Sequence, residues 1–244
     1  MKLDILAFGV HPDDVELGCS GTLLAAMNEG KQVGIIDLTR GELGTRGSAE
    51  IREKEAADAA AVLGITVREN LGLADGFFMN DEASQRKVIT MIRKYRPSII
   101  LANALDDRHP DHGRSGKLVA DAAFLAGLRK ISTQLDGQEQ EAWKPAYIFH
   151  YIQDRFIEPD FVVDITAYMD RKIDSVLAYA TQFYNPNPDK DEPQTYISTP
   201  QFLETVKARA LMLGKRVGTG FGEGFCTQKT LGIRGFDAFI QNIT

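Results

Sequence analysis

The chain has 244 residues, of which 43% are hydrophobic and 25% charged, and its formal net charge at pH 7 is -6. This length and composition suit one globular α/β domain. A nucleic-acid-binding protein would usually carry a basic run or face, and no such run is present in the sequence. Nucleic acid is therefore not expected as a partner.

The cellular setting is predicted from the cysteines and the apolar segments. Cys19 and Cys226 cannot form a disulfide framework, which favours a reducing compartment. Asp4 interrupts the short apolar stretch near the N-terminus, so no signal peptide is expected. No segment approaches the roughly 20 apolar residues that span a bilayer. We expect a cytoplasmic protein with no membrane partner.

The first half of the chain alternates strand and helix patterns. Apolar, β-favouring runs predict strands at 3–10, 32–39, 66–71 and 98–102. Apolar residues at helical spacing predict helices at 15–30, 49–63, 82–95 and from 112 or 113 to 128. Repeated strand–helix units with short connections predict a Rossmann-like α/β fold, with a mostly parallel sheet covered by helices on both faces.

The second half is less regular. The sequence predicts strands at 146–152 and 161–165, helices at 169–180 and 200–213, a polar loop or insertion at 131–144, a proline-punctuated loop at 183–193 and a glycine-rich tail at 214–225. No linker is rich enough to separate two domains. We expect a single domain over 1–244 with a less regular C-terminal part.

Two polar segments follow buried strands of the predicted sheet. His11-Pro12-Asp13-Asp14 comes after the first strand, and the segment 106–113, which contains His109 and His112, comes after the fourth. In open α/β sheets, ligands bind beyond the carboxyl ends of the strands. We therefore expect the two segments to meet at one rim of the sheet.

The residue types in these segments suit a metal ion. His11 and Asp14 are three residues apart around a helix start and can face one point, which His112 reaches if the two strands are neighbours. Two imidazoles and one carboxylate form a catalytic zinc set with a position left for water. The same set accepts Fe²⁺ or other divalent ions. A single histidine at a strand end is more often structural, but two such segments favour the metal.

The remaining polar residues suit hydrolysis. Asp13 is placed to act as a general base toward an activated water molecule, and His109 to stabilise an oxyanion or protonate a leaving nitrogen. Asp111 is expected to hold His109 in the required tautomer. Together these groups predict the hydrolysis of an amide or ester. The alternative for Asp13 is that it only caps the first helix.

These motifs resemble the PIG-L/LmbE-like family of zinc-dependent N-acetylglucosaminyl deacetylases, and the resemblance covers most of the chain. It implies a Rossmann-like α/β fold. It also implies zinc ligands at His11, Asp14 and His112, a general base at Asp13, and assistance of the tetrahedral intermediate by His109. The family's first motif usually has glutamate directly after the two aspartates, whereas here Val15 intervenes before the glutamate.

Within this family the chain is most similar to the bacillithiol-biosynthesis deacetylases, through the segments 39–47, 182–186, 195–198 and 222–225. The implied reaction is hydrolysis of the N-acetyl group of N-acetylglucosaminyl-malate, giving glucosaminyl-malate and acetate. A deacetylase of another GlcNAc conjugate and a thiol-conjugate amidase are the alternatives. The resemblance also suggests a homo-oligomer such as a hexamer.

An anionic, sugar-containing substrate would need polar contacts at the rim. A guanidinium can clamp a carboxylate of malate, so Arg52 and Arg46 are predicted substrate contacts. The alternative for Arg52 is an exposed helix residue that pairs with Glu55. Asp75 is predicted to accept from sugar hydroxyls, or to be an ordinary turn residue. Tyr184 is predicted to overhang the site from the long loop.

Two other classes of protein account for these residues less well. A dinucleotide-dependent oxidoreductase needs a glycine-rich phosphate loop at the first turn, where this chain has His-Pro-Asp-Asp. A non-catalytic sugar- or metal-binding module would have no need of Asp13. The deacetylase hypothesis explains both polar segments.

Overall fold

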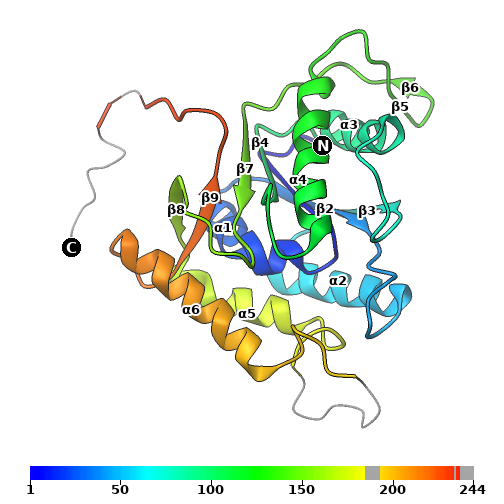
Figure 1. Cartoon of the computed structure of the whole chain (residues 1–244). Helices are drawn as coiled ribbons and strands as arrows, with labels where there is room; N and C mark the ends of the chain where they lie inside the picture. The colour runs from blue at the N-terminus through cyan, green and yellow to red at the C-terminus, as the bar shows by residue number, and fades with distance from the viewer. Residues whose placement is uncertain (185–192, 234, 237–244) are drawn as a thin grey trace.

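Figure 1 shows the computed structural model of the chain, which describes residues 1–184, 193–233 and 235–236. Its centre is a seven-stranded sheet in the order β3-β2-β1-β4-β7-β9-β8. The strands are β1 (Ile5–Gly9), β2 (Val33–Thr39), β3 (Arg68–Leu73), β4 (Ile99–Asn103), β7 (Tyr147–Tyr151), β8 (Phe161–Asp164) and β9 (Gly222–Cys226). The first five of these are parallel, whereas β9 runs antiparallel to both β7 and β8.

The strand order places the two polar segments side by side. The chain steps from β1 outward to β2 and β3, and then returns to the other side of β1 with β4. Such a reversal opens a crevice beyond the carboxyl ends of the two central strands. The segment that begins at His11 follows β1, and the segment 106–113 follows β4. The predicted Rossmann-like, mostly parallel sheet is confirmed.

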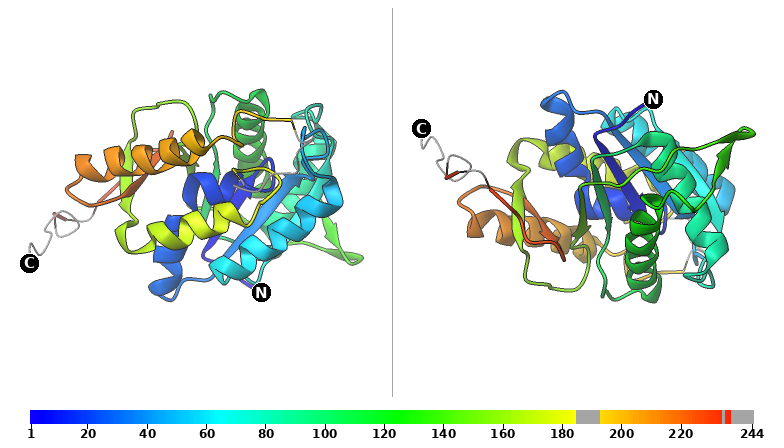
Figure 2. Two further views of the ribbon diagram at one scale, coloured as in Figure 1. Left: turned by 90° about the horizontal axis from the view of Figure 1, so that it is seen from below. Right: turned by 90° about the horizontal axis from the view of Figure 1, so that it is seen from above.

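Helices cover both faces of the sheet, as Figure 2 shows. They are α1 (Asp14–Asn28), α2 (Ala49–Leu63), α3 (Glu82–Tyr95), α4 (Pro110–Ala126), α5 (Met169–Leu177) and α6 (Pro200–Arg216), with a 3₁₀ turn at Thr166–Tyr168. The pleat of β1 sends Leu6 and Phe8 into the core with α3 and α4, and Ile5 and Ala7 into the core with α1. A third core joins α1, α2, α5 and α6.

Local sequence signals explain where several helices begin and end. The side chains of Ser48, Asp81 and Thr199 each accept a backbone hydrogen bond at the start of α2, α3 and α6. Gly64 ends α2 in the left-handed conformation, with φ 76°. Asp13 stands at the start of α1 but makes no side-chain capping bond. The capping alternative for Asp13 is therefore wrong.

Three predicted segments differ from the structure. Helix α4 begins at Pro110, earlier than predicted, because proline suits the first helical turn and His109 accepts from the backbone N–H of Asp111. The segment 131–144 contains a short hairpin, β5 (Gln134–Leu135) and β6 (Gln138–Glu139). The predicted glycine-rich tail contains β9, whose pairing with two neighbours outweighs its poor strand propensity.

In the described part of the chain, no helix has the length and apolarity needed to cross a membrane.

Gly18 provides a test of the packing between α1 and the sheet. A Cβ atom at this position would lie 2.2 Å from the ring of buried Tyr151, whose hydroxyl donates to the Phe8 carbonyl. We expect Gly18→Ala to lower the free energy of unfolding by about 1–3 kcal/mol, as overpacked cores do. Urea denaturation measures this change. Alanine is otherwise the better helix former, so an unchanged or higher stability would contradict the packing described.

Candidate active site

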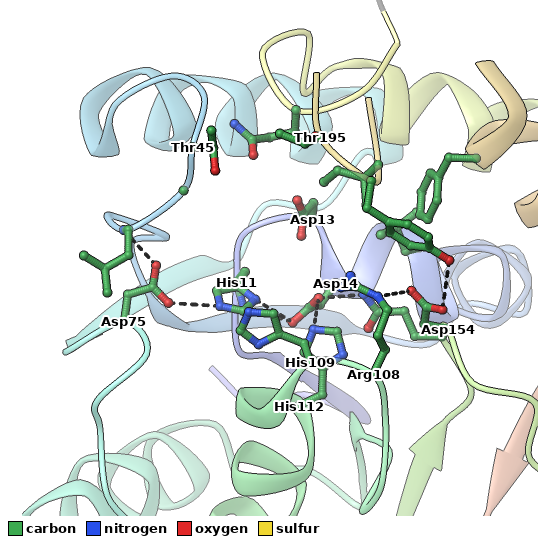
Figure 3. A pocket seen from close by; sticks show the side chains of 18 of the residues that line it. His11, Asp13, Asp14, Thr45, Asp75, Arg108, His109, His112, Asp154 and Thr195 are labelled. Carbon is green, nitrogen blue, oxygen red and sulfur yellow. Dashed lines mark hydrogen bonds and ion pairs between the residues drawn. The ribbon is translucent and has the colours of Figure 1, made fainter. Parts of the chain in front are cut away.

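The two polar segments line one cavity of about 380 Å³ at the carboxyl ends of β1 and β4. Figure 3 shows His11, His109, His112 and Asp14 gathered on its floor, with Asp13 above them. Loops that follow β2, β3 and β7, together with the segment 195–197, complete the wall. The site is thus assembled from chain segments that are far apart in the sequence.

Asp14 lies between two of the imidazoles. Its Oδ1 is 3.2 Å from His112 Nε2, and its Oδ2 is 3.8 Å from His11 Nδ1. Ligand atoms held at roughly 2.0–2.2 Å from a tetrahedral zinc ion are about 3.4 Å apart. The distance from Asp14 to His112 is close to this value and the distance to His11 is longer, so the Asp14 carboxylate lies within reach of both imidazoles.

The outer nitrogens of the same two histidines are bound by carboxylates. His11 Nε2 is 3.0 Å from Asp75 Oδ1, and His112 Nδ1 is 2.7 Å from Asp107 Oδ2. Metal-binding histidines usually donate their second ring N–H to such a partner, which fixes the tautomer and turns the other nitrogen to the metal. The two pairs leave the inner nitrogens of His11 and His112 facing Asp14.

His109 joins the same cluster. The donor atoms of His11, His109 and His112 all lie within 4.8 Å of one another, and a second such group is formed by His11, Asp75 and Asp111. His109 Nδ1 accepts from the backbone N–H of Asp111, which directs Nε2 of His109 to other partners. Burial and the nearby His11 and His112 lower the pKa of His109. The cluster can therefore supply a neutral third imidazole.

The Asp111 side chain does not contact the His109 ring, which bonds to the backbone N–H of Asp111 instead. Its carboxylate accepts from the backbone N–H of Gly76 and from Arg114 Nη1, and it lies 3.8 Å from His11 Nε2. The early start of α4 turns this side chain toward the loop after β3. Asp111 therefore holds the His109 ring through its backbone N–H and not through its carboxylate, which borders His11 instead.

Asp13 is a buried carboxylate that faces the cavity. Its Oδ2 accepts a hydrogen bond of 2.9 Å from Arg52 Nη2. Burial raises the pKa of Asp13 to about 7, although the charge of Arg52 opposes this rise. A carboxyl group with such a pKa can both accept and release a proton near neutral pH.

Asp14 is held ionised. Burial would raise its pKa, but the charge and hydrogen bond of His112 and the charge of His11 outweigh burial and lower it well below the usual value. Its oxygens accept from the backbone of Val10 and His11 and from the side chains of Asn103 and Gln153. An ionised carboxylate is the form that binds a metal ion.

Sequence reasoning missed three residues that hold these groups. Asp107 lies within the segment 106–113 and binds His112, so its sequence neighbourhood was a signal. Asn103 is a buried polar residue that ends β4 and donates to Asp14. Gln153 also donates to Asp14, but it follows β7 with no motif to mark it.

The predicted substrate contacts lie in different settings. Arg52 is 4% exposed and pairs with Asp13, so its alternative as an exposed partner of Glu55 is wrong. Asp75 is buried between His11 and the backbone N–H of Leu43. Arg46 is buried, with its carbonyl bound by Gln182, and Tyr184 is 39% exposed. Residues 185–192 of the predicted long loop lie outside the described residues.

Known proteins resemble this chain in sequence. Residues 6–123 match the family model "PIG-L: GlcNAc-PI de-N-acetylase". The chain is 28% identical to the diacetylchitobiose deacetylase of Thermococcus kodakarensis over 90% of this chain and 81% of that protein. It is 31% identical to the uncharacterized deacetylase YaiS of Escherichia coli, over 57% of this chain and 75% of that protein. It is 28% identical to the probable N-acetyl-alpha-D-glucosaminyl L-malate deacetylase 2 of Bacillus anthracis, over 71% of this chain and 78% of that protein.

Solved structures share the whole architecture. The conserved protein TT1542 from Thermus thermophilus superposes with a TM-score of 0.83 at 36% identity, covering 95% of this chain and 98% of that one. The N,N'-diacetylchitobiose deacetylase from Pyrococcus horikoshii, in complex with an inhibitor, superposes with a TM-score of 0.78 at 25% identity. The match covers 97% of this chain and 88% of that one. Fold and site define a hydrolase of the N-deacetylase class, built on an α/β sheet. The chain belongs to the PIG-L family of deacetylases.

Proposed function

We propose that this chain is a zinc-dependent N-deacetylase that removes the acetyl group from a small GlcNAc conjugate. The observation that carries the proposal is the position of Asp14 between His11 and His112, each of which has its outer nitrogen on a carboxylate. Asp13 and His109, which border the same cavity, supply groups for proton transfer. The residues present therefore fit both the metal and the reaction.

Each residue has a role that follows from its place. His11, Asp14 and His112 would hold the zinc ion. When bound, zinc supplies Lewis acidity, which makes water a better nucleophile and a carbonyl a better electrophile. Asp13 is placed to take the proton of the attacking water, since its pKa near 7 suits a general base. Asp75 and Asp107 fix the orientation of the two histidines.

His109 is the candidate partner of the developing oxyanion. Attack of water on the carbonyl carbon of the acetamide moves an electron pair to the carbonyl oxygen. A hydrogen-bond donor at that oxygen stabilises the transition state. The C–N bond then breaks, the amine leaves with a proton, and acetate remains. The protonated Asp13 can donate that proton, and the neutral His109 imidazole can donate a hydrogen bond to the oxyanion.

Two substrates are proposed within the class. The segments 39–47, 182–186, 195–198 and 222–225 favour N-acetylglucosaminyl-malate, and the Bacillus anthracis relative bears the name of that activity. Diacetylchitobiose is the second candidate, because the relative and the solved structure that carry its name align over most of this chain. The two share an N-acetylglucosaminyl unit and differ in charge.

A substrate panel tests the proposal. Zinc-loaded protein is incubated with N-acetylglucosaminyl-malate, N,N'-diacetylchitobiose, N-acetylglucosamine and a thiol-conjugate amide, and released amine and acetate are measured together. We expect kcat/KM to be highest for the malate conjugate. A higher value for diacetylchitobiose would transfer the assignment to the second candidate. Release from none of them, with zinc bound, would contradict the proposed function.

Zinc binding is expected to release about two protons at pH 7. Burial opposes protonation of His11 and His112. Hydrogen bonds of His11 to Asp111 and Asp75 nevertheless raise its pKa to about 9, and the charge of Asp14 with the Asp107 bond raises that of His112 to about 10. We therefore expect both imidazoles to be positively charged at pH 7 in the zinc-free protein, whereas zinc binds the neutral form. Zinc affinity should rise with pH until both have lost their protons.

Calorimetric titration with zinc in buffers of different ionisation enthalpy measures this proton release. A titration of EDTA with zinc in the same buffers calibrates the method. Binding that releases no proton would contradict the expected protonation of these two histidines in the zinc-free protein.

A further inference from the structure

Arg52 joins α2 to the turn that carries the proposed base. Its guanidinium is buried, and Nη2 donates both to the Pro12 carbonyl, at 2.6 Å, and to Asp13 Oδ2, at 2.9 Å. One nitrogen thus holds the backbone before Asp13 and the carboxylate of Asp13 itself. These bonds reach 39 and 40 residues along the chain and tie α2 to the start of α1.

The backbone of Asp13 needs such support. Its φ is 128° and its ψ is -22°, a conformation that residues with a side chain rarely adopt. A residue keeps such a conformation only where its surroundings hold it, and these residues concentrate at functional sites. The side chain makes no capping bond that would hold Asp13 to α1. The contacts from Arg52 are therefore well placed to fix this turn.

The glycine-rich loop after β2 is shaped around the guanidinium. Gly41 has φ +64°, and a Cβ atom there would lie 2.2 Å from Arg52 Nη1. Its carbonyl accepts from the same Nη1 at 3.4 Å. A Cβ atom at Gly44 would lie 3.4 Å from Nη1. The loop thus closes over Arg52 where a side chain at position 41 would not fit.

We infer that Arg52 is a positioning residue, which sets the carboxylate of Asp13 for catalysis and does not serve as the clamp of an anionic substrate. This inference rests on the proposed function, since it assumes that Asp13 takes the proton of water. A base displaced by about 1 Å loses on the order of 10²-fold in rate, because reacting atoms must meet in a narrow geometry. The loss should be in kcat and should be independent of substrate charge.

The test compares Arg52→Ala and Arg52→Lys with wild type on a dianionic and a neutral substrate, N-acetylglucosaminyl-malate and N,N'-diacetylchitobiose. For Arg52→Ala we expect kcat to fall about 100-fold on both, with KM within about threefold and zinc content unchanged. The kcat of Arg52→Lys should lie between those of wild type and Arg52→Ala, because one ammonium group cannot reproduce the guanidinium geometry. Added guanidinium should partly restore Arg52→Ala. A rise in KM confined to the malate conjugate, with kcat preserved, would overturn the inference in favour of a clamp.

Two further variants separate positioning from a general loss of structure. Gly41→Ala crowds Arg52 without removing its charge and should lower kcat on both substrates. Gly72→Ala is its matched control, since Gly72 also has a positive φ, +56°, but a Cβ atom there meets nothing within 4 Å. Arg40→Ala removes an exposed arginine of the same loop, which pairs with Glu50 and Glu53, and should keep kcat within about twofold. Equal losses in Gly41→Ala and Gly72→Ala would overturn the inference.

A crystal structure of Arg52→Ala decides the inference independently of activity. We expect the Asp13 carboxylate to move and φ of Asp13 to leave its present region. An Asp13 that stays in place would overturn the inference. If zinc-loaded wild type released acetate from neither substrate, the proposed function would fail, and this structure would still show whether Arg52 positions Asp13.

Discussion

The Asp13→Asn variant is expected to bind zinc like wild type and to lose about 10²–10⁴-fold in kcat, the range that a general base contributes. Asparagine keeps the size of the side chain and a carbonyl oxygen for Arg52, but it cannot take a proton from water. Asp13 lies beside the proposed ligands and bonds to Arg52, so zinc should stay bound. Steady-state kinetics, with zinc measured on the same samples, provide the result.

Asp13→Ala is the companion variant and should also keep zinc while losing hydrolysis. If either variant lost zinc as completely as a ligand variant, Asp13 would be a ligand and not the base. If Asp13→Asn kept full activity with zinc bound, the catalytic hypothesis would be wrong, and a binding module would become the better interpretation.

The His112→Ala variant should lose both zinc and hydrolysis, and His11→Ala should behave in the same way. Removing an outer carboxylate partner of a metal-binding histidine typically costs 10–100-fold in metal affinity or activity. Loss of the imidazole itself should cost more than about 100-fold in zinc affinity. Competition with a chromogenic chelator measures the affinity, and acetate release measures the activity.

Asp107→Asn is the matched comparison for His112→Ala. It leaves the imidazole in place and removes the negative charge of the carboxylate that partners its outer nitrogen. We expect its zinc affinity to fall by about 10–100-fold, and excess zinc should restore most of its activity. Normal zinc binding by His112→Ala would contradict the ligand set and would direct attention to the group formed by His11, Asp75 and Asp111.

Much of the fold could be predicted because local patterns and global structure agree. The apolar runs of β1, β2 and β4 are buried on both faces of the sheet, so they stand out in the sequence as continuous hydrophobic stretches. The prediction missed β9, where glycine is required by close packing. A Cβ atom at Gly222 would lie 2.5 Å from Val162. Propensity cannot reveal such a strand, because tertiary contacts select it.

The site was predictable where its chemistry is concentrated in short motifs. His11, Asp14 and His112 were expected to meet, and the structure brings their side chains together. The partners that orient them were harder to foresee, since Gln153 and Asp75 come from other loops and only the folded sheet joins them. Arg52 shows the limit most clearly. Its distance along the chain from Asp13 gave no sign that the two side chains form a buried ion pair.

Reconstitution with zinc tests the central claim most directly. Apoprotein prepared with a chelator is titrated with zinc, and acetate release from N-acetylglucosaminyl-malate and N,N'-diacetylchitobiose is measured at each addition. The structure predicts that activity is absent at the start, rises in proportion to zinc, and reaches its plateau at about one ion per chain, as one three-ligand site requires. Full acetate release by the zinc-free protein would contradict the proposed metal-dependent mechanism.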